Sequence, residues 1–253
     1  MSALSWDQTG ERLYETGVKK GVLYPYNTTT KQYRPGVAWN GLSSVTESPS
    51  GAEPNNIYAD DMKYLSLMSA EELGATIEAY TYPKEFAVCD GTEELGGLAG
   101  INIGQQERTK FGLCYRTTVG NDVVGNKYGY KLHLLYGCKA SPSEKAYQSI
   151  NDSPEAIAFS WEVTTDPVAV DAIAGITTEY NSTSLLTIDV AAYIAGAVGS
   201  EITGDTEESR KAKIAALEVA LYGQDADAEH SIEATDPYLP LPNEVYTILK
   251  VTA

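Results

Sequence analysis

Basic residues, histidine and cysteine are scarce in this 253-residue chain. Its 18 lysines and arginines are outnumbered by 35 aspartates and glutamates, which gives a formal net charge of −17. Nonspecific binding to nucleic acid depends on cationic side chains that neutralise phosphates, so this charge balance argues against it. An acidic surface also keeps a protein soluble, and that second explanation of the charge stays open.

Only two histidines are present, which leaves acid–base chemistry few partners. His133 lies in the middle of an expected strand, and we expect it to be a structural or surface histidine. No Gly-X-Ser-X-Gly segment is present to form the strained serine turn of a hydrolase. Asp60 and Asp61, like Glu71 and Glu72, are neighbours in expected strands, so the two carboxylates of each pair should point to opposite faces and cannot flank one substrate. The sequence predicts no catalytic residue, and we expect the protein not to be an enzyme.

Two segments with some likeness to ligand-binding loops lack the residues that such loops need. Glu93–Gln106 is rich in glycine, but its glycines do not follow the Gly-X-Gly-X-X-Gly order of a dinucleotide-binding turn. Asp225–Glu229 resembles half of a calcium-binding loop, yet His230 stands at the position of the required glycine and Asp236 at that of the bidentate glutamate. We therefore expect no metal and no cofactor.

Long hydrophobic runs are also missing. The first 21 residues contain no apolar core suited to export, and no stretch approaches the length needed to span a membrane. The cysteines, Cys89, Cys114 and Cys138, form an odd set without metal-type spacing. We expect reduced, buried thiols in a protein made in the cytosol.

Alternation of apolar and polar residues is the main pattern that is present, and it predicts strands. The clearest case is Lys110–Lys139, where two alternating runs flank a turn of Gly, Asn and Asp residues and predict a hairpin. Shorter strands are expected at Val22–Tyr26, Val37–Glu47, Ile57–Tyr64, Ile157–Val163 and Leu185–Val190.

The segment Ser69–Tyr82 is ambiguous. Ser69 with Glu72 forms a capping-box pattern, whereas Gly74–Tyr82 has the composition of a strand. We expect a single helical turn followed by a strand. Pro83 is then well placed at the first position of a short helix, and Gly91 suits a left-handed stop.

After Pro167 the pattern changes, which predicts a β domain over residues 1–168 and a C-terminal extension over 169–253 that packs on it. The extension should contain one amphipathic helix, Glu207–Tyr222, with an apolar stripe and with Asp205 and Glu208 as its capping box. The stripe consists of Ile214, Leu217 and Leu221. Asn243–Val251 is an amphipathic segment whose secondary structure the pattern leaves undecided.

A polar loop is expected at Glu47–Asn55, which combines two prolines, a glycine and few apolar residues. Such a composition cannot offset the entropy of ordering in a monomer. We expect this loop to become ordered only against another subunit.

Several segments in succession resemble the major tail proteins, or tail tube proteins, of long non-contractile-tailed phages that infect Gram-positive bacteria. The resemblance covers most of the chain in order, and it departs mainly in Ala191–Glu208, a connection longer than expected. It rests on Tyr58–Asp61, Ile77–Phe86, Cys89–Gly91, Phe111–Thr117, Gly129–Gly137, Phe159–Pro167, Ala215–Glu218, Leu221–Gly223 and Leu239–Val245.

The resemblance implies a mainly β fold, a sandwich or barrel-like tail tube domain with a small helix. It implies a structural virion protein whose hexameric rings stack into a tube for delivery of genome DNA, assembled in the host cytoplasm without membrane contact. Its partners would be further copies of itself, the tape measure protein, the tail terminator and the distal tail proteins. Ring closure would also pair strand edges that otherwise promote aggregation.

Within such a tube the expected loop, Glu47 to Asn55, would contact the next subunit or ring. It comprises Glu47, Ser48, Pro49, Ser50, Gly51, Ala52, Glu53, Pro54 and Asn55. DNA must slide through without binding, so an acidic lumen is expected. The candidates are Asp60, Asp61, Glu78 and Glu162, taken from the polar faces of expected strands.

Three other classes of function remain open from the sequence. The tube protein of a contractile injection apparatus would share the fold but need a sheath. A β-sandwich binding module, such as an adhesin or carbohydrate binder, would act as a discrete particle. An acidic glycoside hydrolase is the weakest alternative, because the sequence places no carboxylate pair.

Overall fold

A computed structural model describes residues 4–33, 35–147, 149–150, 156–173, 179–196, 206–227 and 233–250. Within these residues the chain is mainly β, as the sequence predicts. The strands are β1 Leu13–Asn27, β2 Gln32–Tyr33, β3 Val37–Trp39, β4 Leu42–Gly51, β5 Pro54–Ala59, β6 Met62–Met68, β7 Glu71–Ala79, β8 Glu93–Glu94, β9 Asn102–Ile103, β10 Phe111–Asn121, β11 Gly125–Ala140, β12 Phe159–Thr165 and β13 Leu185–Asp189. The helices are α1 Val190–Ala195, α2 Glu207–Tyr222 and α3 Pro242–Leu249, with short 3-10 turns η1 Lys84–Phe86 and η2 Leu95–Gly97.

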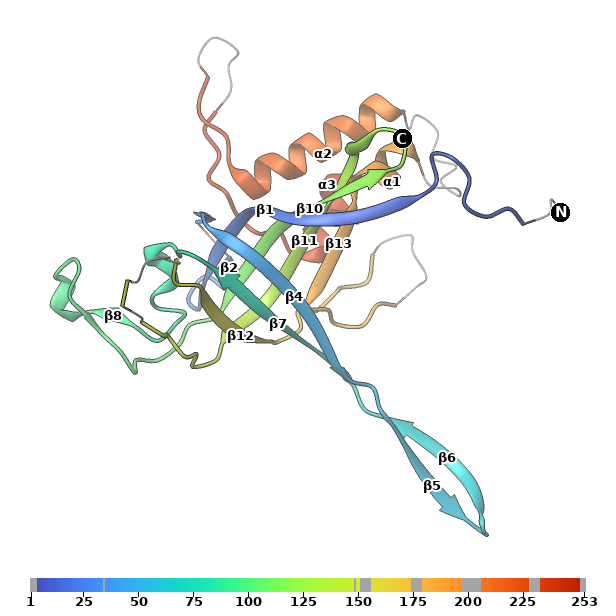
Figure 1. Cartoon of the computed structure of the whole chain (residues 1–253), viewed down its shortest axis with the longest axis horizontal. Helices are drawn as coiled ribbons and strands as arrows, with labels where there is room; N and C mark the ends of the chain where they lie inside the picture. The colour runs from blue at the N-terminus through green and yellow to red at the C-terminus, as the bar shows by residue number, and fades with distance from the viewer. Residues whose placement is uncertain are drawn as a thin grey trace.

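One large antiparallel sheet organises the molecule, in the order β2-β1-β10-β11-β12-β7-β4, with β3 beside β1 and β13 beside β11. The hairpin predicted at Lys110–Lys139 is confirmed as β10 and β11. Two strands share one edge of β11: β12 pairs with Cys138–Ala140, and β13 pairs with Lys131–Leu135. The sheet therefore divides at β11, and β4, β7 and β12 cross over the layer of β1, β10, β11 and β13 (Figure 1).

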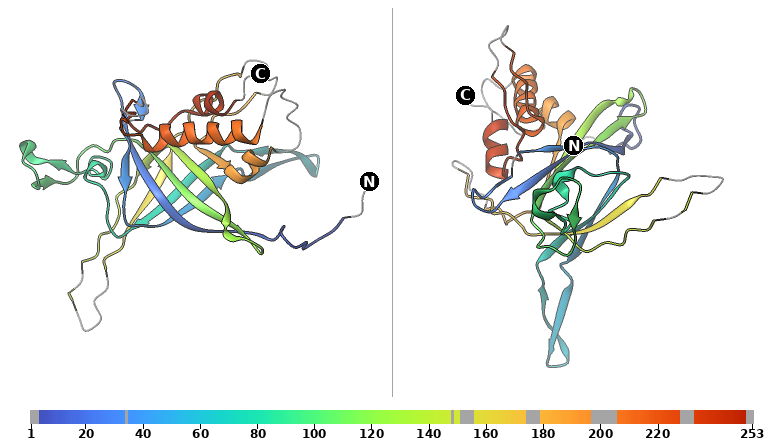
Figure 2. Two further views of the ribbon diagram at one scale, coloured as in Figure 1. Left: turned by 90° about the horizontal axis from the view of Figure 1, so that it is seen from above. Right: turned by 90° about the vertical axis from the view of Figure 1, so that its left-hand side faces the viewer.

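Both faces of the central layer are covered, so successive residues along β10 and β11 face two different cores. The inner core lies between the two layers of the sheet and includes Leu113, Tyr115, Ile77 and Trp161. The outer core lies under the helices, which cover one side of the sheet in Figure 2. It consists of Val22, Tyr24, Tyr33, Cys114, Leu132, Leu134, Tyr136, Ile188, Val190, Ile214, Leu217, Leu221, Leu239 and Val245.

The helix predicted at Glu207–Tyr222 is confirmed as α2, and its predicted apolar stripe is buried in the outer core. Its cap differs from the prediction. The Thr206 side chain, not that of Asp205, is the N-terminal cap, and it accepts a hydrogen bond from Ser209 N at 3.1 Å. Asp205 itself lies outside the described residues. The C-terminal segment of undecided type forms α3, which begins at Pro242.

Three local predictions are corrected by strand pairing. The helical turn expected after Ser69 is absent, because Glu71–Ala79 is a strand hydrogen-bonded to β4 along one edge and to β12 along the other. The strand expected at Val37–Glu47 is interrupted by a turn at Gly41, whose φ is +76°. The strand expected at Val22–Tyr26 is longer than predicted, because β1 begins at Leu13 and its first half also pairs with β10.

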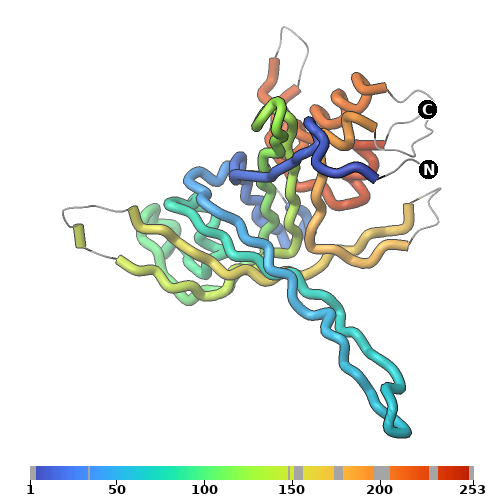
Figure 3. The backbone as a smooth tube through the Cα atoms, turned by 45° about the vertical axis from the view of Figure 1, so that its right-hand side comes forward, coloured from blue at the N-terminus to red at the C-terminus, as the bar shows by residue number. Residues whose placement is uncertain are grey.

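A two-stranded arm, β5 and β6, projects from the body on the far side from the helices (Figures 1 and 3). The long ribbon of β4 and β7 leads into it, and Gly51 pairs with Glu71 at the end of that ribbon. We refer to Pro54–Met68 as the arm.

Candidate functional site

The arm ends in a tight turn formed by Asp60 and Asp61, whose φ angles are +51° and +63°. Positive φ at both central residues is the geometry of a two-residue hairpin turn that matches strand twist. The alternating pattern predicts these two residues on the polar faces of a strand, and that prediction is wrong. They occupy the tip of the arm because Ala59 and Met62 pair on either side of them.

The two faces of the arm differ in chemistry. Ile57 pairs with Leu65 and Ala59 with Met62, and side chains of directly paired residues lie on the same face. On the opposite face Asn56 pairs with Ser66, and the Ser66 hydroxyl donates to Asn56 Oδ1 at 2.8 Å. The arm therefore has one mainly apolar face, exposed in the single chain, and an opposite face that mixes Asn56, Lys63 and Ser66 with the exposed Tyr58 and Met68.

The segment Glu47–Asn55 is not a loop. Most of it belongs to β4, which pairs with β7 from Leu42 to Gly51, and its last two residues begin β5. Pro49 is tolerated because β4 is the edge strand in the described part of the sheet and needs no N–H on its free side. The backbone turns at Gly51 and Ala52, with φ of +84° and +53°, where the ribbon passes into the arm.

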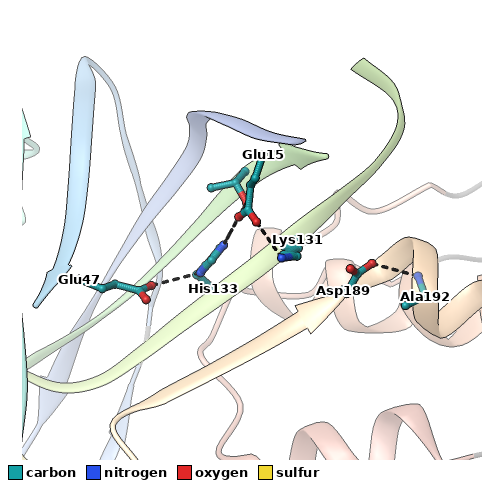
Figure 4. Close-up of polar contacts among 7 residues, drawn as sticks. Glu15, Glu47, Lys131, His133, Asp189 and Ala192 are labelled. Carbon is teal, nitrogen blue, oxygen red and sulfur yellow. Dashed lines mark hydrogen bonds and ion pairs between the residues drawn. The ribbon is translucent and has the colours of Figure 1, made fainter. Parts of the chain in front are cut away.

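Polar side chains join β4, the strand that leads to the arm, to the central layer (Figure 4), and we call these contacts the anchor. His133 on β11 lies between two carboxylates: its Nδ1 is 3.2 Å from Glu47 Oε1 on β4, and its Nε2 is 3.5 Å from Glu15 Oε1 on β1. The Tyr115 ring stacks on the imidazole with a centroid distance of 4.7 Å, and its hydroxyl donates to Glu47. Lys131 Nζ donates to Glu15 Oε2 at 2.7 Å.

This arrangement changes the acidity of both carboxyl groups. The hydrogen bond to His133 lowers the pKa of Glu47 below its usual value, against the opposing effect of burial and with help from Tyr115. For Glu15, burial raises the pKa, but hydrogen bonds from Lys131 and Thr117 outweigh it and leave the pKa lowered. Both groups are therefore held as carboxylates, which favours an anchor that persists near neutral pH.

The same side chains also have the order of a hydroxyl–imidazole–carboxylate triad. Thr117 Oγ1 is 3.0 Å from His133 Nε2, and Glu47 contacts His133 Nδ1. The hydroxyl, however, donates to Glu15 Oε1 at 2.6 Å. Both imidazole nitrogens face carboxylates, so neither is free to accept the proton of an attacking hydroxyl. The geometry supports the structural role expected for His133.

Glu78 and Glu162 are brought together on one exposed face. They lie on the neighbouring strands β7 and β12, where Glu78 pairs with Ser160 and Glu162 with Thr76. Ser44 of β4 donates to the Glu78 carboxylate at 2.8 Å. The other face of these strands is buried in the inner core. Asp60 and Asp61 do not join this pair, because they lie at the tip of the arm.

The glycine-rich segment is not assembled into a dinucleotide-binding turn. It forms the small hairpin of β8 and β9 instead of a strand-to-helix turn. Residues 228 and 229 of the calcium-like segment lie outside the described residues, as does His230. Among the residues that the structure describes, no group of three or more His, Cys, Asp or Glu side chains is placed to hold a metal ion.

No protein-family model matches this sequence, and no curated protein matches it. In the described part of the chain, none of the helices has the length and apolar character to cross a membrane.

Proposed function

We propose that this protein is a structural virion protein that forms a phage tail tube by stacking of hexameric rings. The observation that carries the proposal is the exposed apolar face of the arm. A two-stranded ribbon is marginally stable alone in water, and an exposed apolar face promotes association. An arm of this kind is suited to contact another copy, and the anchor around His133 attaches the ribbon that carries it to the central layer.

The exposed face of β7 and β12 supports the same proposal. A tube for DNA needs an inner wall that repels phosphates, and Glu78 and Glu162 provide carboxylates on one continuous sheet face. In this proposal that face lines the lumen, with Asp60 and Asp61 displaced to the contact between subunits. The arm also takes over the stacking role expected for the segment from Glu47 to Asn55, which becomes the ribbon that carries it.

Electron microscopy of the purified chain, after negative staining, tests the proposal. Hollow tubes of stacked six-fold rings are the expected result. Discrete particles at all concentrations would contradict it and favour a β-sandwich binding module or adhesin. Tubes that bind a separate sheath protein would favour a contractile injection apparatus.

A further inference from the structure

The arm presents four large apolar side chains on one face, and no strand or helix in the described part of the chain covers them. Met62 and Leu67 are 65% and 54% exposed, and Ile57 and Leu65 are 40% and 37% exposed. The strands that carry them pair only with each other among the described residues. Burial of this face would remove apolar surface from water and stabilise the arm itself.

An apolar groove of about 700 Å³ lies elsewhere on the same chain, between β13, α1 and α3. The groove is lined by Leu186 and Ile188 of β13, by Tyr193 of α1, and by Tyr246 and Leu249 of α3. The edge of β13 that faces away from β11 has no strand partner in the described structure. This groove is suited to an extended, apolar segment.

The arm cannot reach this groove in its own chain. Figures 1 and 3 and the right-hand view of Figure 2 show the arm leading away from α1, α2 and α3. We propose that the apolar face of the arm of one copy occupies the groove between β13 and α3 of the next copy. The proposal deepens the proposed tube function, on which it rests, by naming the surface that receives the arm.

Charge supports this choice of occupant. Lys250 is the charged residue that lines the groove, where it lies 5.7 Å from the centre of the Tyr246 ring. The tip of the arm carries Asp60 and Asp61. In a chain with few cations, a lysine at the groove gives an acidic tip a complementary contact that also fixes the direction of the arm.

The arm and the groove are different surfaces, so the contact is head-to-tail. Each added copy leaves one arm and one groove free, which permits closed rings or open stacks without any other interface. An arm-to-arm contact would instead end at a dimer. This difference makes the interface testable with pairs of defective variants.

The test uses an arm variant, Ile57→Asp with Leu65→Asp, and a groove variant, Tyr180→Asp with Tyr246→Asp. Tyr180 also lines the groove and is half exposed. Asn56→Asp with Ser66→Asp is the matched control, because it places the same two charges directly opposite each other on the other face of the arm. Each defective variant alone should lose the arm–groove contact, so that the dissociation constant of this contact rises at least tenfold. Their mixture should form one-to-one dimers, since one partner retains the arm and the other the groove. Sedimentation velocity measures these species, and near-ultraviolet circular dichroism checks that each variant is folded.

A charge exchange gives a second readout. Lys250→Glu should weaken association, and Asp61→Lys in the partner should restore it. The proposal is overturned if the mixture stays monomeric, if the groove variant associates like the unaltered chain, or if the control is as defective as the arm variant. If the mixed variants formed dimers but the unaltered chain formed no tubes, the proposed function would be refuted and the arm–groove contact would still hold.

Discussion

Glu47 and His133 are 86 positions apart, and their side chains meet at 3.2 Å although β4 and β11 are not neighbours in the sheet. The contact crosses from one layer to the other and joins the ribbon that carries the arm to the central strands. Glu15 on β1 holds the second nitrogen of the same imidazole. The attachment of the ribbon to the central layer therefore includes a polar contact that is sensitive to acid.

Replacement of Glu47 by glutamine should destabilise the protein at pH 7. The change removes the charge that faces His133 and weakens the hydrogen bond from Tyr115. Loss of a hydrogen bond to a charged group costs on the order of 1–3 kcal/mol in free energy of unfolding. Urea denaturation measures the loss, and Glu53→Gln, on an exposed residue next to the arm, is the control that should stay near the unaltered value. An E47Q protein as stable as the unaltered chain would show that the anchor contributes nothing.

The same variant should lose part of the pH dependence of stability. Glu47 and Glu15 have pKa values in the folded protein below the unfolded value near 4.5. Their contribution is therefore fully present above pH 4.5 and is lost as pH falls through the lower folded values. Unfolding midpoints of the unaltered chain should fall steeply below pH 4.5, and those of E47Q should fall less. Parallel curves for the two proteins would contradict the assignment.

All three cysteines should be reduced and unreactive in the folded protein. Cys89, Cys114 and Cys138 are free and buried. Burial raises the pKa of Cys89 to about 11 and that of Cys114 to about 12, and it raises the pKa of Cys138 as well. Because the thiolate is the reactive form, a thiol reagent should label none of them at neutral pH. Three thiols should react after denaturation without reductant, and a smaller number would indicate a disulfide.

Removal of the arm should separate folding from assembly. Replacement of residues 53–69 by an Asn-Gly turn keeps the whole pairing of β4 with β7, which ends at Gly51 and Glu71. The shortened protein should keep its unfolding midpoint but form no tubes under the microscope. Deletion of Glu47–Asn55, in contrast, removes strand residues and should lower stability. Normal tubes from the shortened protein would exclude the arm from assembly.

The acidic sheet face can be tested in the assembled particle. Glu78→Lys with Glu162→Lys should leave tubes intact but slow DNA ejection, because lysines would bind phosphates with release of counterions. The defect should ease as salt rises, since screening weakens such contacts. Glu207→Lys on the exposed end of α2 is the control for a change of charge elsewhere. If ejection at low salt were unchanged, this face would not act on DNA, and its acidity would be explained by solubility.

The sequence by itself determined the elements whose pattern is local and regular. The hairpin of β10 and β11 follows from alternation on both sides of a polar turn, and α2 from a helical stripe that ends at Gly223. The mainly β class follows from the same alternation. The strand around His133 also follows from the alternating pattern, and the structure places its imidazole between two carboxylates.

Only the tertiary structure revealed the arm, the anchor around His133 and the groove between β13 and α3. Proline, serine and glycine in Glu47–Asn55 indicate a loop locally, but pairing with β7 makes most of it an edge strand, where proline is tolerated. The sequence at Asp60 and Asp61 lacks the Asn-Gly pattern that indicates a tight turn. The division of this segment into β5 and β6 is therefore not visible in the sequence. The pairing of Glu47 with His133 depends on the crossing of two layers, and no local periodicity encodes contacts between strands so distant along the chain.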